Sequence, residues 1–102
     1  MKFMTFVMFD VAKAAEMAQV SDKTADMPGI KRLAQYACQG IPFPHTIPPN
    51  TMVVVTINDA ESNEAMAAAN YPAGLAGATV WNVPVLEMPI GGAAETEKKY
   101  RG

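Results

Sequence analysis

The segment Thr51-Met52-Val53-Val54-Val55-Thr56-Ile57 decides the fold of this chain. Its residues are mostly β-branched, which favours an extended strand, and apolar side chains occupy both of the alternating faces. The segment from Phe3 to Phe9 is apolar on both faces in the same way. Strands of this kind are typical of a sheet that is covered on both sides. The sequence therefore predicts a sheet with two buried faces.

Helical patterns follow each of these strands. Asp10 is placed to cap a helix whose apolar residues recur at helical spacing, and Pro28-Gly29 stops it. After the segment 51–57, the spacing Asn58-x-x-Glu61 is compatible with a capping box. We therefore expect Asn58 or Asp59 to cap a second helix, which covers 60–70 and ends at Tyr71-Pro72.

Two further strands complete the pattern. Residues 30–39 predict a strand with Tyr36 and Cys38 on one face and Leu33, Gln35 and Ala37 on the other. Residues 78–88 predict the last strand. Because proline cannot donate to a ladder, Pro84 predicts that this strand lies at a sheet edge or carries a bulge.

The predicted order is β-α-β-β-α-β, which is the ferredoxin-like unit with a four-stranded antiparallel sheet in the α+β class. Residues 1–88 are expected to form this single domain, and residues 89–102 a C-terminal tail that is mobile or crosses to a partner subunit. Two helices cover only one face of such a sheet, whereas its strands are apolar on both. The sequence therefore predicts a homodimer in which two sheets pack face to face.

Composition limits the classes of partner. The chain has 102 residues with a net charge of −2, so nucleic acid is not an expected partner. The apolar start of the chain is too short for a membrane span or a signal core, and no membrane partner is expected. One cysteine, Cys38, excludes an internal disulfide and fits a reducing cytoplasm.

Three segments resemble the dimeric α/β-barrel superfamily, in particular its short, functionally uncharacterised prokaryotic families. They are the opening Met1-Lys2-Phe3-Met4, then Pro28-Gly29-Ile30-Lys31, and the closing segment from Val80 to Met88. The superfamily includes cofactor-free monooxygenases, isomerases, cyclases, haem-dependent enzymes and ligand-sensing domains. The resemblance thus implies a pocket between the sheet and the helices, and it leaves the activity open.

Five residues are candidates for a site. His45 lies in a proline-rich loop and suits a general acid or base, with Tyr36 as a proton donor or anchor. Tyr71, Cys38 and Trp81 are candidates for ligand contacts, although a buried tyrosine or a lone cysteine is often only a packing residue. Trp81 and Asn82 are adjacent in a strand and must point to opposite faces, which favours Trp81 as a core or interface residue.

Two functions follow from these residues. The first is a homodimeric binding protein that holds a small apolar or aromatic ligand without turnover. The second is a cofactor-independent monooxygenase, isomerase or cyclase that acts on a phenolic or carbonyl compound, with His45 as the acid or base. No motif for a metal or a cofactor is present, and the resemblance leaves haem open.

Overall fold

The computed structural model describes residues 1–40 and 48–102, which form one antiparallel four-stranded sheet in the order β2-β3-β1-β4. The strands are β1 (Lys2–Asp10), β2 (Ile30–Ala37), β3 (Thr51–Ala60) and β4 (Thr79–Pro84). The central pair, β1 and β3, is formed by the two apolar segments of the sequence. This strand order with the two crossovers is the ferredoxin-like α+β fold, as the element pattern predicted.

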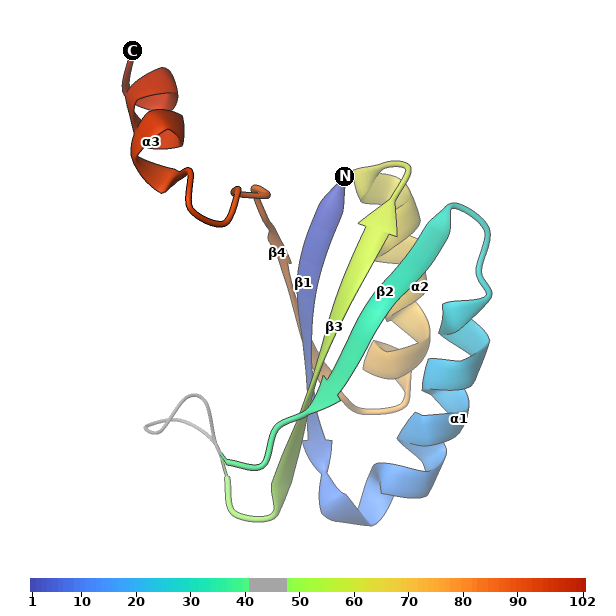
Figure 1. Ribbon diagram of the computed structural model, residues 1–102. Coiled ribbons are helices and arrows are strands. Elements are labelled where there is room, and N and C mark those ends of the chain that lie inside the picture. The colour runs from blue at the N-terminus through green and yellow to red at the C-terminus, as the bar shows by residue number, and fades with distance from the viewer. Residues whose placement is uncertain (41–47) are drawn as a thin grey trace.

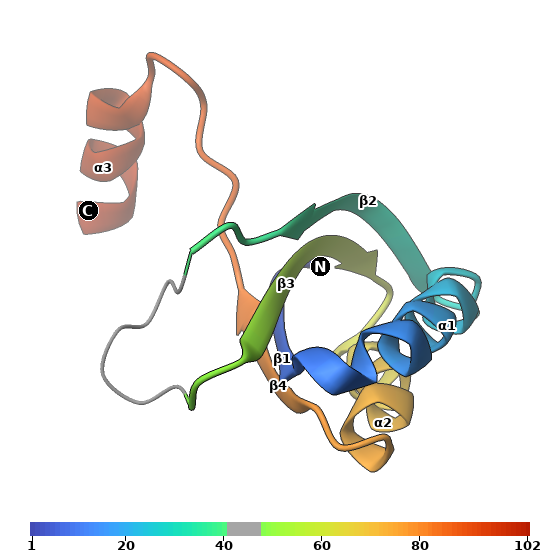
Figure 2. The same cartoon turned by 90° about the horizontal axis from the view of Figure 1, so that it is seen from below.

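Two helices cover one face of this sheet. The 3-10 helix η1 (Val11–Lys13) leads into α1 (Ala14–Ala25), and α2 (Asn63–Leu75) lies beside it (Figures 1 and 2). Asp10 caps η1, because its carboxylate accepts a hydrogen bond from the Ala12 backbone N–H at 2.8 Å. No helix in the described parts of the chain is long and apolar enough to cross a membrane.

The packed core lies between the sheet and these helices. Phe3, Ala60, Met66 and Ala69 form a buried cluster, each with at most 5% of its surface exposed. Met27 and Ile30 pack against this cluster from the α1–β2 connection. The small alanine side chains let α2 approach the sheet closely, so that the cluster closes one end of the space between the two layers.

The start of α2 differs from the sequence-based prediction. Asn58 and Asp59 do not cap the helix, because β3 continues through both residues to Ala60. The cap is Ser62, whose hydroxyl accepts a hydrogen bond from the Ala65 N–H at 3.1 Å. The helix also continues past Pro72 to Leu75, because a proline so near the C-terminus removes only one hydrogen bond of the last turns.

A second difference is an irregularity in β2. Arg32 pairs with Asn58 of β3, and Ala34 pairs with the preceding residue Ile57, so Leu33 has no partner of its own and forms a bulge. The simple alternation expected for this strand therefore fails at Leu33. As a result Arg32 and Gln35, three residues apart, both face the helices.

β4 lies at the edge of the sheet, next to β1, and Pro84 is its last residue. This agrees with the expected place of a residue that lacks a backbone donor. One more backbone hydrogen bond follows, from Val85 N–H to the Lys2 carbonyl at 3.0 Å. The predicted strand therefore ends about at Pro84 and does not continue to Met88.

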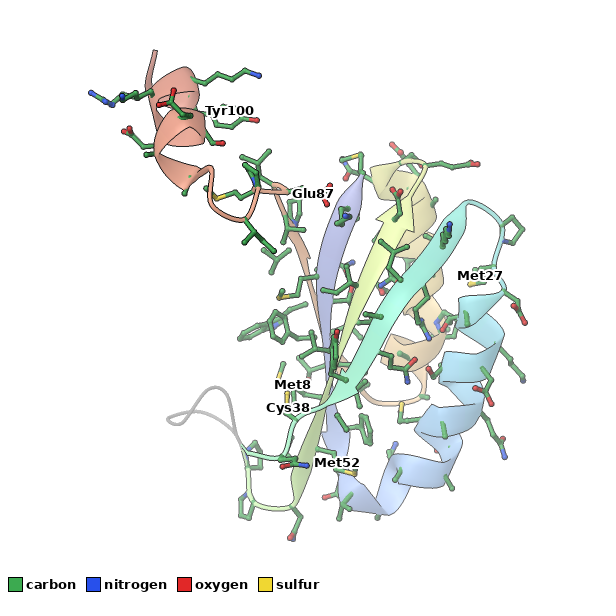
Figure 3. The ribbon with its side chains drawn as sticks, viewed as in Figure 1. Met8, Met27, Cys38, Met52, Glu87 and Tyr100 are labelled. Atoms are coloured by element: carbon green, nitrogen blue, oxygen red, sulfur yellow. The ribbon has the colours of Figure 1, made fainter. Side chains whose placement is uncertain are left out.

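The chain beyond β4 leaves the body of the molecule. Residues 85–92 are extended or turned, and α3 (Ala93–Arg101) stands apart from the sheet and from the other helices (Figures 1 and 2). No residue of α3 is buried, and Tyr100 lies far from the sheet (Figure 3). We call residues 85–101 the arm.

Candidate functional site

A cavity of about 210 Å³ lies between the sheet and the two helices. Its floor is the helix-facing side of the three strands β1, β2 and β3, and its roof is the inner faces of α1 and α2. Its walls are mainly apolar and consist of Val7, Phe9, Ala14, Met17, Ala18, Val20, Ile30, Met52, Val54, Met66, Ala69 and Ala73. An apolar concave space with a few polar groups is the usual form of a small-molecule site.

The polar groups of the floor form a continuous chain of hydrogen bonds, which we call the polar line: Arg32, Asn58, Thr56, Thr5 and Asn82. Arg32 Nε donates to Asn58 Oδ1 at 3.4 Å, and Asn58 Nδ2 donates to Thr56 Oγ1 at 2.8 Å. Asn58 Nδ2 also contacts Thr5 Oγ1 at 3.5 Å, and the Thr5 hydroxyl donates to Asn82 Oδ1 at 2.7 Å. The polar line therefore crosses all four strands of the sheet.

The middle of the polar line is the most deeply buried part of the molecule. Asn58 is 1% exposed, and Thr5 and Thr56 are almost as deeply buried. A polar side chain in such a place is costly unless its hydrogen bonds are made, and here they are made within the polar line. The polar line thus fixes three neutral polar side chains in the floor of an apolar cavity.

Arg32 lies at the β2 end of the polar line, where its guanidinium reaches α1. Nη1 donates to the Ser21 carbonyl at 3.2 Å, to the Ser21 hydroxyl at 2.9 Å and to Gln35 Oε1 at 3.2 Å. Nη2 donates to the Thr24 hydroxyl at 3.2 Å. Burial lowers the pKa of Arg32 below its ordinary value, and the negative charge of Asp22 partly opposes this shift.

Three of the predicted site residues lie on the opposite side of the sheet. Tyr36 pairs with Val55, and Trp81 pairs with Phe6, whereas their neighbours Gln35 and Val80 pair with residues that line the cavity. Cys38 bonds through its backbone to Val53, and its side chain lies near Met8 on the face away from the helices (Figure 3). Tyr36, Cys38 and Trp81 therefore lie together on the outer sheet face.

The other two candidates are separate from this group. Tyr71 lines a shallow groove between α2 and β4, together with Asn70, Val80 and Asn82. Asn70 belongs to both the groove and the cavity, so the two spaces are neighbours. His45 falls within 41–47, outside the described residues. The described residues thus do not bring Tyr36 and Tyr71 together at one site.

The sequence analysis did not identify Arg32, Asn58 or Thr5 as site residues. For Asn58 and Thr5 a signal was present, because Thr5, Thr56 and Asn58 are polar positions on one face of strands that are otherwise apolar. For Arg32 strict alternation is misleading, because it places the side chain on the same face as Tyr36. The bulge at Leu33 puts Arg32 and Tyr36 on opposite faces, and Arg32 is the one that lies at the cavity.

Comparisons with known proteins do not assign a family or an activity to this chain. No family model matches this sequence, and no curated protein matches it. One similar solved structure is a “putative antibiotic biosynthesis monooxygenase” from Caulobacter crescentus CB15, with 16% sequence identity and a TM-score of 0.41. The match covers 84% of this chain and 91% of that chain. A similarity at this level does not assign an activity to this chain.

Proposed function

We propose that the protein is a homodimer that binds one small apolar or aromatic molecule in each subunit, in the cavity between the sheet and the helices. The observation that carries this proposal is the cavity itself, with apolar walls and hydrogen-bonded polar groups confined to its floor. An empty cavity without polar groups would be explained as loose packing. A buried polar line beside it indicates a site that orients a ligand.

The size of the cavity limits the ligand. An apolar protein cavity of roughly 150 Å³ holds a benzene molecule. The cavity of about 210 Å³ therefore has room for one six-membered ring with a small substituent. Polycyclic compounds are too large for the cavity in this form.

The dimer proposal rests on the outer sheet face, which includes, besides Cys38, the residues Met4, Phe6, Tyr36, Val55, Ile57, Trp81 and Val83. Trp81 is 47% exposed and Tyr36 is 62% exposed, although both are large side chains in the sheet. A contiguous apolar face of this kind marks an interaction surface. A second copy of the chain supplies the same apolar face in a self-complementary arrangement.

The arm supports the same proposal. Leu86, Met88 and Ile90 are well exposed and follow directly after β4, whose residues Trp81 and Val83 belong to the outer sheet face. In a single subunit about half or more of the surface of each of these apolar side chains is exposed. We therefore propose that the arm crosses to the partner subunit.

One experiment tests both parts of this proposal. Native mass spectrometry of the purified full chain, with single-ring compounds added, reports the number of subunits and of bound molecules together. We expect a dimer with two ligands, and loss of the ligands in Val54→Phe, which places a ring in the cavity from the floor. A monomer would contradict the dimer, and equal binding by Val54→Phe would contradict the site.

Catalysis is the second candidate function, and one observation favours it. The guanidinium of Arg32 adjoins the cavity, where such a donor stabilises negative charge that develops on a substrate oxygen. An enzyme of the cofactor-independent monooxygenase, isomerase or cyclase type also needs an acid or base. The described residues of the cavity wall include none that titrates near neutral pH, so this role stays a prediction for His45.

Product analysis separates the two candidates. We expect a bound single-ring phenol to be recovered unchanged after incubation with the protein in air. A product that forms with the natural chain and not with His45→Ala would instead establish turnover.

A further inference from the structure

One charged side chain stands among the described residues of the cavity wall, and it is Arg32. The other polar wall residues are neutral: Thr5, Ser21, Thr24, Gln35, Thr56, Asn58 and Asn70. A guanidinium at the edge of an apolar cavity loses part of its hydration. Its surroundings therefore decide which chemical group it favours as a neighbour.

The acceptors around Arg32 are all neutral oxygens. They belong to Ser21, Thr24, Gln35 and Asn58, at donor to acceptor distances of 2.9–3.4 Å. Within residues 1–40 and 48–102, no carboxylate lies within ion-pair distance of the guanidinium. The cation is thus half-buried and hydrogen-bonded, and its charge has no direct counter-ion in this part of the chain.

The hydrogen bonds are also unevenly distributed. Among the described residues, Nη1 carries two hydrogens and has three acceptors, whereas Nη2 carries two hydrogens and has one acceptor, Thr24. One N–H of Nη2 is therefore available for a further oxygen. The Gln35 side chain is largely exposed, so an incoming oxygen can also displace it from Nη1.

A carboxylate satisfies each of these conditions. It supplies the missing negative charge, and its two oxygens match the fork of the guanidinium. The apolar walls, which include Phe9, Met52 and Val54, then accept the ring or alkyl part of the same molecule. The anionic end of such a molecule matches Arg32, and its apolar part matches the apolar walls of the cavity.

We propose that the ligand of this cavity is a single-ring aromatic carboxylate, or an apolar carboxylate of similar size, whose anionic group binds Arg32. This inference rests on the proposed binding function and specifies its ligand class. Arg32 is then the residue that selects anionic over neutral ligands, and the bulge at Leu33 is the backbone feature that makes the selection possible.

The test uses titration calorimetry on the purified protein with two probes, benzoate, which carries a charged group, and benzyl alcohol, which does not. The variants are Arg32→Gln, which removes the charge, and Arg32→Lys, which keeps the charge and loses the fork. Lys23→Gln is the matched control, because it removes one positive charge from an exposed position on α1 outside the cavity wall. Thermal unfolding of each unliganded variant shows whether it is folded.

We expect the natural chain to bind benzoate more tightly than benzyl alcohol. Arg32→Gln should weaken benzoate binding by about 10- to 100-fold, the usual effect of losing hydrogen bonds to a charged group. Benzyl alcohol binding should change by less than about 3-fold, because a neutral hydroxyl gains little from the charge. Arg32→Lys should lie between these results, and Lys23→Gln should bind both probes as the natural chain does.

Three outcomes would overturn the inference, and they are distinguishable. If benzyl alcohol binds and benzoate does not, the cavity is a ligand site and the carboxylate proposal fails. If Arg32→Gln weakens both probes equally, Arg32 only holds α1 against the sheet. If neither probe binds the natural chain at millimolar concentration, the proposed binding function itself fails.

Discussion

Arg32 and Asn58 face each other directly across the β2–β3 ladder, and Arg32 Nε donates to Asn58 Oδ1 at 3.4 Å. This contact joins the one charged residue of the described cavity wall to its most deeply buried side chain. The guanidinium is held on the other side by Ser21 and Thr24 of α1. The pair therefore couples the orientation of Arg32 to the hydrogen bonds inside the sheet.

Asn58→Asp tests this coupling. The substitution places a carboxylate beside the guanidinium without a change in side-chain size, so the protein itself supplies the counter-ion. We expect benzoate affinity to fall by about 10-fold or more, with benzyl alcohol affinity unchanged, in titration calorimetry. Unchanged benzoate affinity would show that Arg32 does not bind the carboxylate.

Asn58→Leu tests the contribution of the polar line to stability. Leucine is similar in size, but it leaves the Thr56 hydroxyl and Arg32 Nε without their partner. We expect a loss of roughly 1–3 kcal/mol in the free energy of unfolding, measured with urea. An unchanged free energy of unfolding would mean that water replaces the amide. Water would then reach the centre of the sheet in spite of its low exposure.

The pH dependence of benzoate binding follows from the groups present. Burial lowers the pKa of Arg32, which means that folding disfavours its charged form. The resulting loss of folding stability is constant at pH values below the lowered pKa of Arg32. It disappears only as the pH rises through that pKa. From about pH 6 to about pH 9 an arginine keeps its charge and a carboxylate is ionised, so we expect constant benzoate affinity across this range. A midpoint near neutral pH would point to His45 as a further contact.

The fold was predictable from the sequence because it depends on features that a single strand or helix displays. The β-α-β-β-α-β order follows from two strands that are apolar on both faces and from the helices after them. The edge position of β4 follows from Pro84 near its end. The site was not predictable in the same way. The position of Arg32 depends on a bulge that pairing with β3 reveals, and Leu33 carries no sequence signal for it.

The helix cap shows the same limit. Asn58 has the chemistry of an N-cap and the right distance to Glu61, so local spacing favours it as the start of α2. The structure instead uses Asn58 inside β3, because its amide joins hydroxyl groups of β1 and β3 across the sheet. Tertiary contacts of this kind cannot be read from spacing alone, since the partner Thr5 lies 53 residues away.

Ser62 offers a direct check of the corrected cap. Ser62→Ala removes the acceptor for the Ala65 N–H, and we expect a loss of about 1 kcal/mol in the free energy of unfolding. Ser62→Asp keeps an acceptor and places a negative charge at the helix start, so it should retain full stability. Thermal unfolding measures the stability of both variants. Equal losses of stability in Ser62→Ala and Ser62→Asp would contradict the cap.

The outer sheet face is tested by placing a charge in it. Trp81→Lys should convert the dimer to a monomer, because a lysine there must lose its hydration when two sheets pack together. Leu75→Lys is the matched control, because Leu75 is 85% exposed and lies on α2, on the other side of the sheet. Light scattering after size-exclusion chromatography measures the molar mass of both variants. A monomer from both variants, or from neither, would contradict a dimer through this face.

The arm gives a prediction of its own, because Ile90 is expected to become buried only in the dimer. Ile90 is fully exposed in the single subunit, so Ile90→Lys should not change the stability of the folded domain. If the arm crosses to the partner, Ile90 becomes buried there, and the substitution should weaken dimerisation by about 100-fold or more, because two such apolar side chains are lost in each dimer. Gly102→Lys, at the end of the chain beyond α3, adds the same charge and should have no effect. Dilution series in analytical ultracentrifugation measure the dissociation constant, and an unchanged constant for Ile90→Lys would mean that the arm is not part of the interface.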